Sequence, residues 1–246
     1  MNYYLKEIKW IIGIMTVAVL IILAGCSTQR PEICGPEQTR RIMHEKIRRF
    51  DAIVKHDLVP AFRKAGVPYP PQKIALLAFK AEHKMELWGQ DPNAKWCFIR
   101  SFSILGASGG PGPKLQEGDR QVPEGIYGIE CLNPLSHYDV SMRLNYPNNF
   151  DRERAKKDGR NRLGGDIYIH GGCVSIGCIA IGNRYAEELF DLIYHVGTKN
   201  VSVVIAPNDL RRAAPLVGKV RPEWLSVLDL NIKNYLAQFP DDKKYI

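Results

Sequence analysis

The feature that most constrains this chain is the stretch from residue 167 to residue 181, which reads IYIHGGCVSIGCIAI. Its first four residues alternate and end at a histidine, which predicts a short strand. The glycines that follow predict a loop with sharp backbone turns, at positions 171, 172 and 177. A thiol nucleophile needs a base close by and backbone N–H groups that face a developing oxyanion. We therefore predict that Cys178 is a nucleophile and that His170 is its base.

The residues around the thiol suggest supporting roles. The backbone N–H groups of Gly177 and Cys178 lie beside the nucleophile, so we expect them to stabilise the oxyanion. We expect the Ser175 side chain to support the loop by hydrogen bonding. A metal site is the competing interpretation, but the only nearby ligands are His170, Cys173 and Cys178, without the paired Cys-x-x-Cys spacing of structural zinc. We expect no metal and no cofactor, with His137 as the next candidate base or ligand.

The order His-Gly followed by Ser-x-Gly-Cys resembles the YkuD-type L,D-transpeptidase family of peptidoglycan enzymes. The short loop between His170 and Cys178 resembles the YafK-like murein branch of that family. Two positions differ from the broad family: Ile176 stands where many members have a second His, and Ile181-Gly182-Asn183 replaces a segment with an Arg. The resemblance covers roughly 73–207 and includes, in the same order, Gly112-Pro113-Lys114, Gly118-Asp119, Pro123-Glu124-Gly125-Ile126-Tyr127, Leu132-Asn133-Pro134 and Tyr146-Pro147-Asn148.

This resemblance implies a mainly β, α+β fold, a YkuD-like β-sandwich or barrel-type catalytic domain. It implies that the enzyme acts on peptidoglycan stem peptides, at an amide beside a diaminopimelate-type residue. It also implies that the Gly171 carbonyl orients the His170 imidazole. An amine or water would resolve the Cys178 thioester, so L,D-transpeptidase and L,D-bond amidase or hydrolase activities both remain open.

Two further interpretations concern the protein's partners and whether it is an enzyme or a binding protein. Members of the YafK-like branch include enzymes that detach a wall-bound lipoprotein, so a wall-linked lipoprotein is a further partner that the resemblance implies. The alternative from a different class is a non-catalytic envelope lipoprotein that only binds peptidoglycan. The intact pair of His170 and Cys178 favours the enzyme, because a binding module has no need of that chemistry.

The N-terminus predicts export. Lys6 and Lys9 precede an apolar run that ends in Leu23-Ala24-Gly25-Cys26, the pattern of a secretory signal. The tetrad resembles a bacterial lipobox, which implies cleavage after residue 25 and lipidation of Cys26. A Ser at position 27, directly after the lipidated cysteine, resembles the pattern of lipoproteins that are sorted to the outer membrane. We therefore expect a lipid-anchored protein on the periplasmic side of the envelope. The alternative is an uncleaved anchor, for which the run is a little short, since spanning takes about 20 residues.

Export permits disulfides. With Cys26 lipidated and Cys178 free, the other four cysteines allow three connectivities. They are Cys34, Cys97, Cys131 and Cys173. We favour a bridge between Cys97 and Cys131, because both lie in strand-like segments.

Composition is that of one globular domain, with 24% charged and 45% hydrophobic residues. The net charge of +8 suits anionic surfaces such as lipid headgroups or wall polymers. No nucleic-acid motif accompanies the charge, so we do not expect nucleic acid as a partner.

Outside the central motif, periodicity predicts the elements. Residues 26–36 are expected to be a tether and 37–72 a helix followed by a Pro-rich break, with Pro60 as a kink or end. The basic residues of this helix are expected to form a solvated face or, alternatively, a membrane-facing one (Arg40, Arg41, Lys46, Arg48 and Arg49). Strands are expected in the catalytic domain, 73–207, at 74–79, 85–88, 96–102, 126–129, 140–144, 167–170 and 201–205.

The remaining segments of the catalytic domain are a loop, an insertion and a helix. The span 106–112 is too rich in turn residues for a strand and is predicted to be an active-site loop. Residues 151–162 are predicted to be a charged insertion with a helical start, and residues 185–196 an amphipathic helix. The tail, 208–246, is expected to form a helix that packs on the domain or, alternatively, offers a docking surface.

Overall fold

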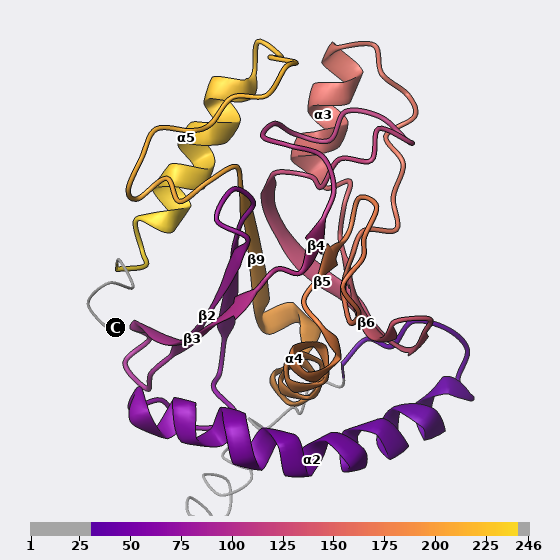
Figure 1. The fold of residues 1–246 in the computed structure, drawn as a ribbon, viewed down its shortest axis with the longest axis vertical. Coiled ribbons are helices and arrows are strands. Elements are labelled where there is room, and N and C mark those ends of the chain that lie inside the picture. Colours follow the sequence, from indigo (N-terminus) through magenta and orange to yellow (C-terminus); the bar gives the residue numbers. More distant parts are fainter. Residues whose placement is uncertain (1–30, 241–246) are drawn as a thin grey trace, which may run out of the picture. The chain divides into compact units, whose positions relative to one another are not determined.

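The computed structural model describes residues 31–240, so the predicted signal peptide, its lipobox and Cys26 lie outside the described residues. Within this range, nine strands form one sheet with helices on both faces, which confirms the mainly β, α+β class (Figure 1). The strand order is β3-β2-β1-β9-β5-β6-β7-β8-β4. No helix in residues 31–240 is both long enough and apolar enough to cross a membrane.

The elements have the following bounds. The helices are α2 (Thr39–Lys64), α3 (Asn149–Lys157), α4 (Asn183–Val196), the short η1 (Thr198–Asn200) and α5 (Leu225–Leu236). The strands are β1 (Ile74–Phe79), β2 (Lys84–Gln90), β3 (Trp96–Ser103), β4 (Gly106–Ala107), β5 (Gly125–Ser136), β6 (Asp139–Leu144), β7 (Tyr168–His170), β8 (Ile179–Ala180) and β9 (Val201–Ala206).

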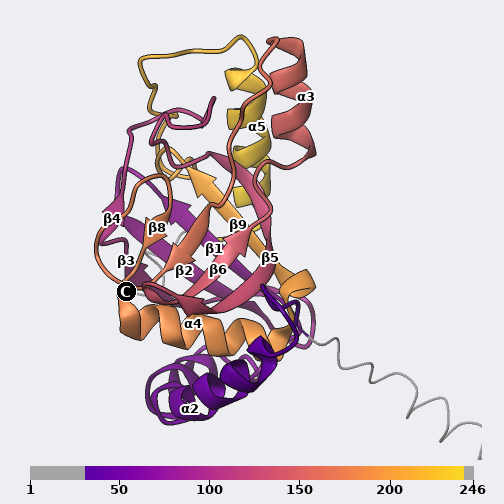
Figure 2. The same cartoon turned by 90° about the vertical axis from the view of Figure 1, so that its right-hand side faces the viewer.

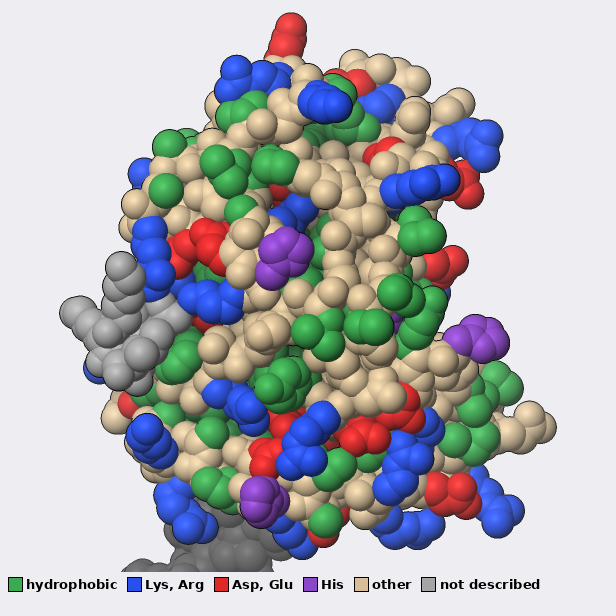
Figure 3. Space-filling view, viewed as in Figure 1, with side chains coloured by type: hydrophobic (Ala, Val, Ile, Leu, Met, Phe, Trp, Pro, Cys, Tyr) green, Lys and Arg blue, Asp and Glu red, His purple; other side chains and the backbone are tan. Residues whose placement is uncertain are grey.

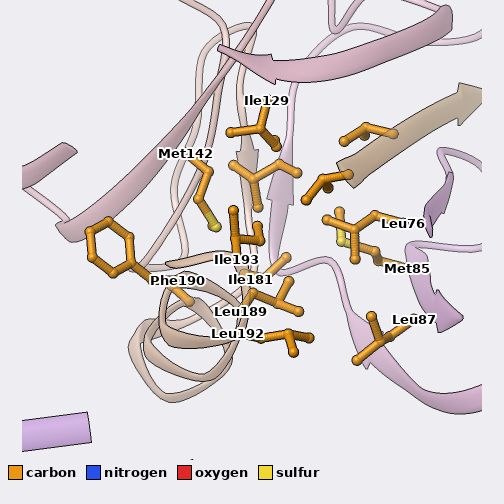
Figure 4. Packing of buried hydrophobic residues seen from close by; sticks show 14 of the residues in the cluster. Leu76, Met85, Leu87, Ile129, Met142, Ile181, Leu189, Phe190, Leu192 and Ile193 are labelled. Carbon is orange, nitrogen blue, oxygen red and sulfur yellow. The ribbon is translucent and has the colours of Figure 1, made fainter. Parts of the chain in front are cut away.

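The centre of the sheet is buried on both faces. Every residue of β1 is buried, and because successive side chains of a strand point to opposite faces, β1 contributes to two separate cores. Leu76 belongs to the core that α4 closes, where strand side chains meet Leu189 and Ile193 (Figure 4). Leu77 belongs to the other core, which α5 closes with Leu228 and neighbouring side chains.

Helix α4 lies between the sheet and α2 (Figure 2). The α2 residues Phe50, Leu58 and Phe62 are fully buried, and the Phe50 ring meets Phe190 of α4 edge to face, with centroids 6.3 Å apart. Pro60 neither ends nor interrupts α2, which continues to Lys64. The N-terminal helix is therefore an integral layer of the domain.

The basic face of α2 is not purely solvated. Acidic and basic side chains are interspersed over the part of the surface where α2 runs (Figure 3). Lys46 is only 18% exposed, and its ammonium pairs with Asp139 at 2.7 Å. Arg49 pairs with the same carboxylate at 3.0 Å and with Glu187 of α4 at 3.1 Å. The helix is thus tied to the catalytic domain by charge as well as by apolar packing.

The disulfide that we favoured from the sequence is wrong. Cys131 of β5 is bonded to Cys34, with Cα atoms 5.2 Å apart. Cys97 lies on β3, which is separated from β5 by β2, β1 and β9. Adjacent strands lie ~4.8 Å apart, so β3 and β5 are roughly 19 Å apart along the sheet, too far for a disulfide. Cys97, Cys173 and Cys178 are free.

The segment that carries Cys34 also differs from its prediction as a tether. Ile33 forms a parallel β-bridge with Leu132, and the Cys34 N–H donates to the Leu132 carbonyl at 2.8 Å. The described end of the segment that we expected to be a tether is therefore fixed along β5.

The span 106–112 also differs from its prediction. Its first two residues form β4, which pairs with β8 in the register Gly106↔Ala180 and Ala107↔Ile179. Local composition argued against a strand, but β8 provides an open edge, and pairing satisfies backbone groups of both segments. The rest of the span is irregular, as expected for a loop.

Candidate active site

The central motif folds as two short parallel strands joined by a loop. In the pairing of β7 with β8, Ile169 lies opposite Ile179 and His170 opposite Ala180. Cys178 immediately precedes β8 and therefore lies beside Tyr168, whose N–H donates to the Cys178 sulfur at 3.4 Å. Side chains two residues apart on a strand share a face, so this register brings Cys178 and His170 to one face of the sheet.

The His170 ring is held at both nitrogens. Nδ1 lies 2.6 Å from the Gly171 carbonyl oxygen, which can only accept, so Nδ1 carries the proton. Nε2 is then the unprotonated nitrogen, and it lies 3.4 Å from Ser175 Oγ. His170 is only 3% exposed, and burial lowers its pKa, with a smaller opposing effect from the Gly171 carbonyl. The imidazole is thus neutral and ready to accept a proton at Nε2.

The Cys178 thiol is partly buried beside a backbone carbonyl. Its S–H donates to the Asp166 carbonyl at 3.5 Å. Burial raises the pKa of Cys178, and the Tyr168 N–H and Ser175 hydroxyl oppose this effect. In the described residues, no hydrogen bond joins Cys178 directly to His170; Ser175 stands between them, since its Oγ also accepts the Cys178 N–H at 3.1 Å. The resting pair is therefore a neutral thiol and a neutral imidazole.

Both expected oxyanion donors are occupied by serine hydroxyls. The Cys178 N–H donates to Ser175 Oγ, and the Gly177 N–H donates to Ser108 Oγ at 2.7 Å. Ser108 Oγ in turn donates to the Arg120 carbonyl at 2.6 Å. The two hydroxyls therefore satisfy N–H groups that an incoming substrate oxygen would need.

A close contact explains one glycine of the loop, and a left-handed backbone conformation explains another. A Cβ on Gly171 would lie 2.4 Å from the Tyr138 carbonyl oxygen and 2.5 Å from Asn183 Oδ1, so a side chain there has no room. Gly177 has a φ of +86°, a left-handed conformation that other residues rarely adopt. Asn183 Oδ1 also accepts the Gly172 N–H at 2.7 Å, which links the loop to the start of α4.

A buried ion pair supports the neighbouring span from 112 to 122, whose Arg120 carbonyl accepts the hydrogen bond from Ser108. Lys80 Nζ donates to Glu124 at 3.0 Å and to the carbonyls of Gly112 and Val122, each at 3.1 Å. Glu124 accepts the Gly112 N–H at 2.8 Å. Lys80 and Glu124 are 9% and 1% exposed. The pair fixes both ends of the span from 112 to 122 against the sheet.

Two hollows lie on the side of the site that carries Asp166 and residues 164–165. One, of about 210 Å³, lies beside Asp166 and Gly177 and is lined by both signs of charge, including Lys114, Arg120 and Glu117. The second, of about 600 Å³, shares the residues 164–165 with the first. It is polar and is lined among others by Glu130, Arg143, Asn145 and Arg152. The smaller hollow includes Gly177, the residue before the thiol, and it meets the larger hollow at residues 164–165.

The structure brings together five of the predicted site residues: His170, Gly171, Ser175, Gly177 and Cys178. Cys173 is exposed on the same loop, and His137 is exposed in the turn between β5 and β6. Sequence reasoning missed the hydrogen-bonding partners Ser108 and Asn183. The only signal for Ser108 was its place in the predicted active-site loop, and Asn183 was noted only as a difference from the family pattern.

Comparison with known proteins identifies the family of the domain. A profile of the YkuD family, described as the L,D-transpeptidase catalytic domain, matches residues 76–205. The putative L,D-transpeptidase YafK of Escherichia coli K12 is 34% identical over 134 residues, 52% of this chain and 52% of that protein. The chain therefore spans about half the length of the curated relatives it matches.

Solved structures that the chain matches include two bacterial proteins. The crystal structure of the helical cell shape determining protein Pgp2 from Campylobacter jejuni aligns with a TM-score of 0.46 and 22% identity, covering 66% of this chain and 54% of that one. The structure of Bd1075 from Bdellovibrio bacteriovorus aligns with a TM-score of 0.41 and 19% identity, covering 67% and 55%.

Proposed function

The chain belongs to the YkuD family of L,D-transpeptidase catalytic domains, and from this we propose that it is an exported cysteine acyl-enzyme acting on peptidoglycan stem peptides. The observation that carries the proposal is the placement of a neutral His170 and the Cys178 thiol on one face of β7 and β8, joined through Ser175. A protein that only binds peptidoglycan does not need a partly buried thiol on the same face as an oriented imidazole.

The first half of the reaction forms a thioester. His170 Nε2 accepts the S–H proton of Cys178, and the sulfur attacks the carbonyl carbon of the amide beside the diaminopimelate-type residue. The C=O electron pair moves onto oxygen, where backbone N–H groups at Gly177 and Cys178 stabilise the negative charge. The C–N bond then breaks, and His170 returns its proton to the leaving amine.

The second half releases the acyl group. An amine or a water molecule gives its proton to His170 and attacks the thioester carbon, and the C–S bond breaks. The proton returns to the Cys178 sulfur, which restores the neutral pair. An amine yields a new crosslink and water yields a shortened peptide, so the acceptor decides between transferase and hydrolase.

The resting electrostatics explain how the thiol avoids side reactions. Burial raises the pKa of Cys178 and lowers the pKa of His170, so each group favours its neutral form. The thiolate is then formed as the substrate arrives, when the attacked carbonyl can take up the charge. The Ser108 and Ser175 hydroxyls must give up the Gly177 and Cys178 N–H groups at the same time.

The two hollows near the site suit a zwitterionic peptide. Stem peptides with a diaminopimelate-type residue carry both amino and carboxylate groups. The smaller hollow offers Lys114 and Arg120 beside Glu117 and Asp166, and the larger adds Arg143. We place the scissile amide over the smaller hollow and the remainder of the stem along residues 164–165.

A disulfide bond in the described residues supports export. The Cys34–Cys131 disulfide is of a kind that persists in oxidising compartments. Together with the predicted signal and lipobox, it supports a lipid-anchored protein on the periplasmic side of the envelope, in the outer membrane. A wall-linked lipoprotein joined to peptidoglycan is a further substrate that we include in this proposal.

The test is product analysis in H₂¹⁸O with the purified full-length protein and a Cys178→Ala control. Defined crosslinked and uncrosslinked peptidoglycan fragments are incubated and analysed by mass spectrometry. New fragments with ¹⁸O in the freed carboxylate indicate hydrolysis, and joined fragments without ¹⁸O indicate transfer. If wild type and folded Cys178→Ala bind the fragments equally and neither changes them, the protein is a binding module and the proposal is wrong.

A further inference from the structure

An aromatic side chain covers the His170 ring. Tyr138, in the turn between β5 and β6, stacks on the imidazole with centroids 4.5 Å apart and planes 29° from parallel. Tyr138 is 44% exposed whereas His170 is 3% exposed, so the tyrosine ring lies between the imidazole and solvent. None of the steps described above uses Tyr138.

The backbone of the turn also packs on the catalytic loop. The Tyr138 carbonyl oxygen would lie 2.4 Å from a Cβ on Gly171, and Tyr138 Cδ1 would lie 3.2 Å from a Cβ on Gly172. Tyr138 therefore contacts three consecutive residues that include the base and the residue whose carbonyl orients it. A shift of the turn would move His170 and Gly171 together.

The turn is held from outside by α2. Asp139 has a φ of +70°, and its carboxylate accepts from Lys46 at 2.7 Å and from Arg49 at 3.0 Å. Lys46 Nζ also donates to the Asp139 backbone carbonyl at 2.8 Å. Lys46 and Asp139 are each 18% exposed, and partly buried charges are screened less by salt than exposed ones. The turn that joins β5 to β6 lies near α2 in Figure 1.

We propose that Tyr138 is a positioning residue that fixes the His170 imidazole for proton transfer from Cys178, and that Lys46 and Arg49 of α2 hold Tyr138 in place through Asp139. The inference rests on the proposed cysteine mechanism. The Gly171 carbonyl and Ser175 hydroxyl restrain the ring in its own plane, through Nδ1 and Nε2. The Tyr138 ring restrains it from the side and, because it stacks on the imidazole, keeps water away from that face.

The central variants are Tyr138→Ala, which removes the ring, and Tyr138→Phe, which keeps it. Tyr138→Ala should lower kcat/KM on the peptidoglycan fragments at pH 7 by about 10- to 100-fold, because small errors in the placement of a catalytic group are costly. Tyr138→Phe should stay within about twofold of wild type, because stacking depends on the ring and not on the hydroxyl. The ring is partly exposed, so both variants are expected to fold.

A second readout does not depend on activity. NMR titration of the His170 ring in the full-length protein, assigned with His170→Gln, reports its pKa directly. Removal of the Tyr138 ring admits water, so the His170 pKa should rise toward the ordinary value of ~6.5, and the acid limb of the pH–rate profile should move to higher pH. The other ionisable groups facing this region are Cys178, His137, Asp139, Lys46, Arg49 and Glu187, and Tyr138→Phe leaves all of them in place.

The contribution of α2 is tested by Lys46→Gln, with Lys55→Gln as the matched control. Lys55 is on the same helix, but within residues 31–240 its only ion pair is with Asp51, one turn away, and it is 71% exposed. Lys46→Gln should move the His170 titration in the same direction as Tyr138→Ala, and Lys55→Gln should not. Asp139→Asn, which tolerates a positive φ, should reproduce the Lys46→Gln effect.

An unchanged His170 titration in Tyr138→Ala would overturn the inference, even if that variant were less stable. An effect of Lys55→Gln equal to that of Lys46→Gln would overturn the role of α2. If wild type has no activity on peptidoglycan, the proposed function fails but the titrations still decide whether Tyr138 and Lys46 position His170.

Discussion

Removal of the Cys34–Cys131 disulfide should destabilise the protein strongly. The bond closes a loop with a sequence separation of 97, and in the chain-entropy description a loop of about 100 residues is worth about 4.7 kcal/mol at 25 °C. Backbone contacts partly survive its loss, because the N–H of Cys34 and the carbonyl of Glu32 still bond to Leu132. We therefore expect Cys34→Ser/Cys131→Ser to lose about 3–5 kcal/mol of unfolding free energy.

The assay is urea unfolding of the full-length protein followed by circular dichroism, with Cys97→Ser as the control. Cys97 is half-buried and free, so its substitution should change the unfolding free energy by less than about 1 kcal/mol. For a domain of this size, a loss of about 3–5 kcal/mol corresponds to a fall in Tm of roughly 6–20 °C. The slope of free energy against urea should rise in the double variant, because its unfolded chain is less compact.

The reasoning would be refuted if the double variant and wild type had equal unfolding free energies under oxidising conditions. It would also be refuted if dithiothreitol lowered the stability of the double variant and of wild type by the same amount, since the double variant has no such bond to reduce.

Three other predictions follow from the site and the N-terminus. His170→Gln should lower kcat/KM at pH 7 by about 10²–10⁴-fold, with partial recovery at alkaline pH, and a pH–rate profile checks this. In the same profile, the acid limb of wild type should lie below the ordinary histidine pKa of ~6.5, because burial lowers the pKa of His170. Near-wild-type activity of His170→Gln at pH 7 would point to another base, with His137 the next to test. Gly106→Ala should cost about 1–3 kcal/mol and reduce activity, because its Cβ would lie 2.7 Å from the Cys173 carbonyl oxygen, whereas Gly110→Ala meets nothing within 4 Å. Thermal melts of the two variants compare them, and equal melting temperatures would contradict the packing argument. Cys26→Ala should abolish lipidation and membrane fractionation, and intact-mass analysis showing an unmodified Cys26 in mature wild type would remove the lipobox claim.

Local sequence patterns predicted most helices and strands, because the periodicity of apolar residues within a segment depends on that segment alone. Amphipathic spacing marked α2 and α4, and apolar runs bounded by turn residues marked β1 and β9. His170 and Cys178 could be identified for a different reason. The catalytic loop is short, so the residues that carry its chemistry are close in sequence as well as in space.

The features that could not be predicted from the sequence depend on contacts between residues that are far apart along the chain. The strand β4 exists because β8 provides an edge, although Gly106 itself is a poor strand residue. The choice of Cys34 over Cys97 follows from the order of strands in the sheet. The contact of Lys46 with Asp139 joins residues 93 apart, and no local pattern in either segment predicts it.

The central claim is that Cys178 carries the acyl group, and trapping that intermediate tests it most directly. Purified protein is mixed with a defined peptidoglycan stem peptide, quenched with acid after a short time, and digested for mass spectrometry. We expect a mass increase equal to the acyl fragment on the peptide that contains Cys178. It should be sensitive to hydroxylamine, as a thioester is, and absent in Cys178→Ala. An acyl group on any other residue, or product formation by folded Cys178→Ala at the wild-type rate, would contradict it.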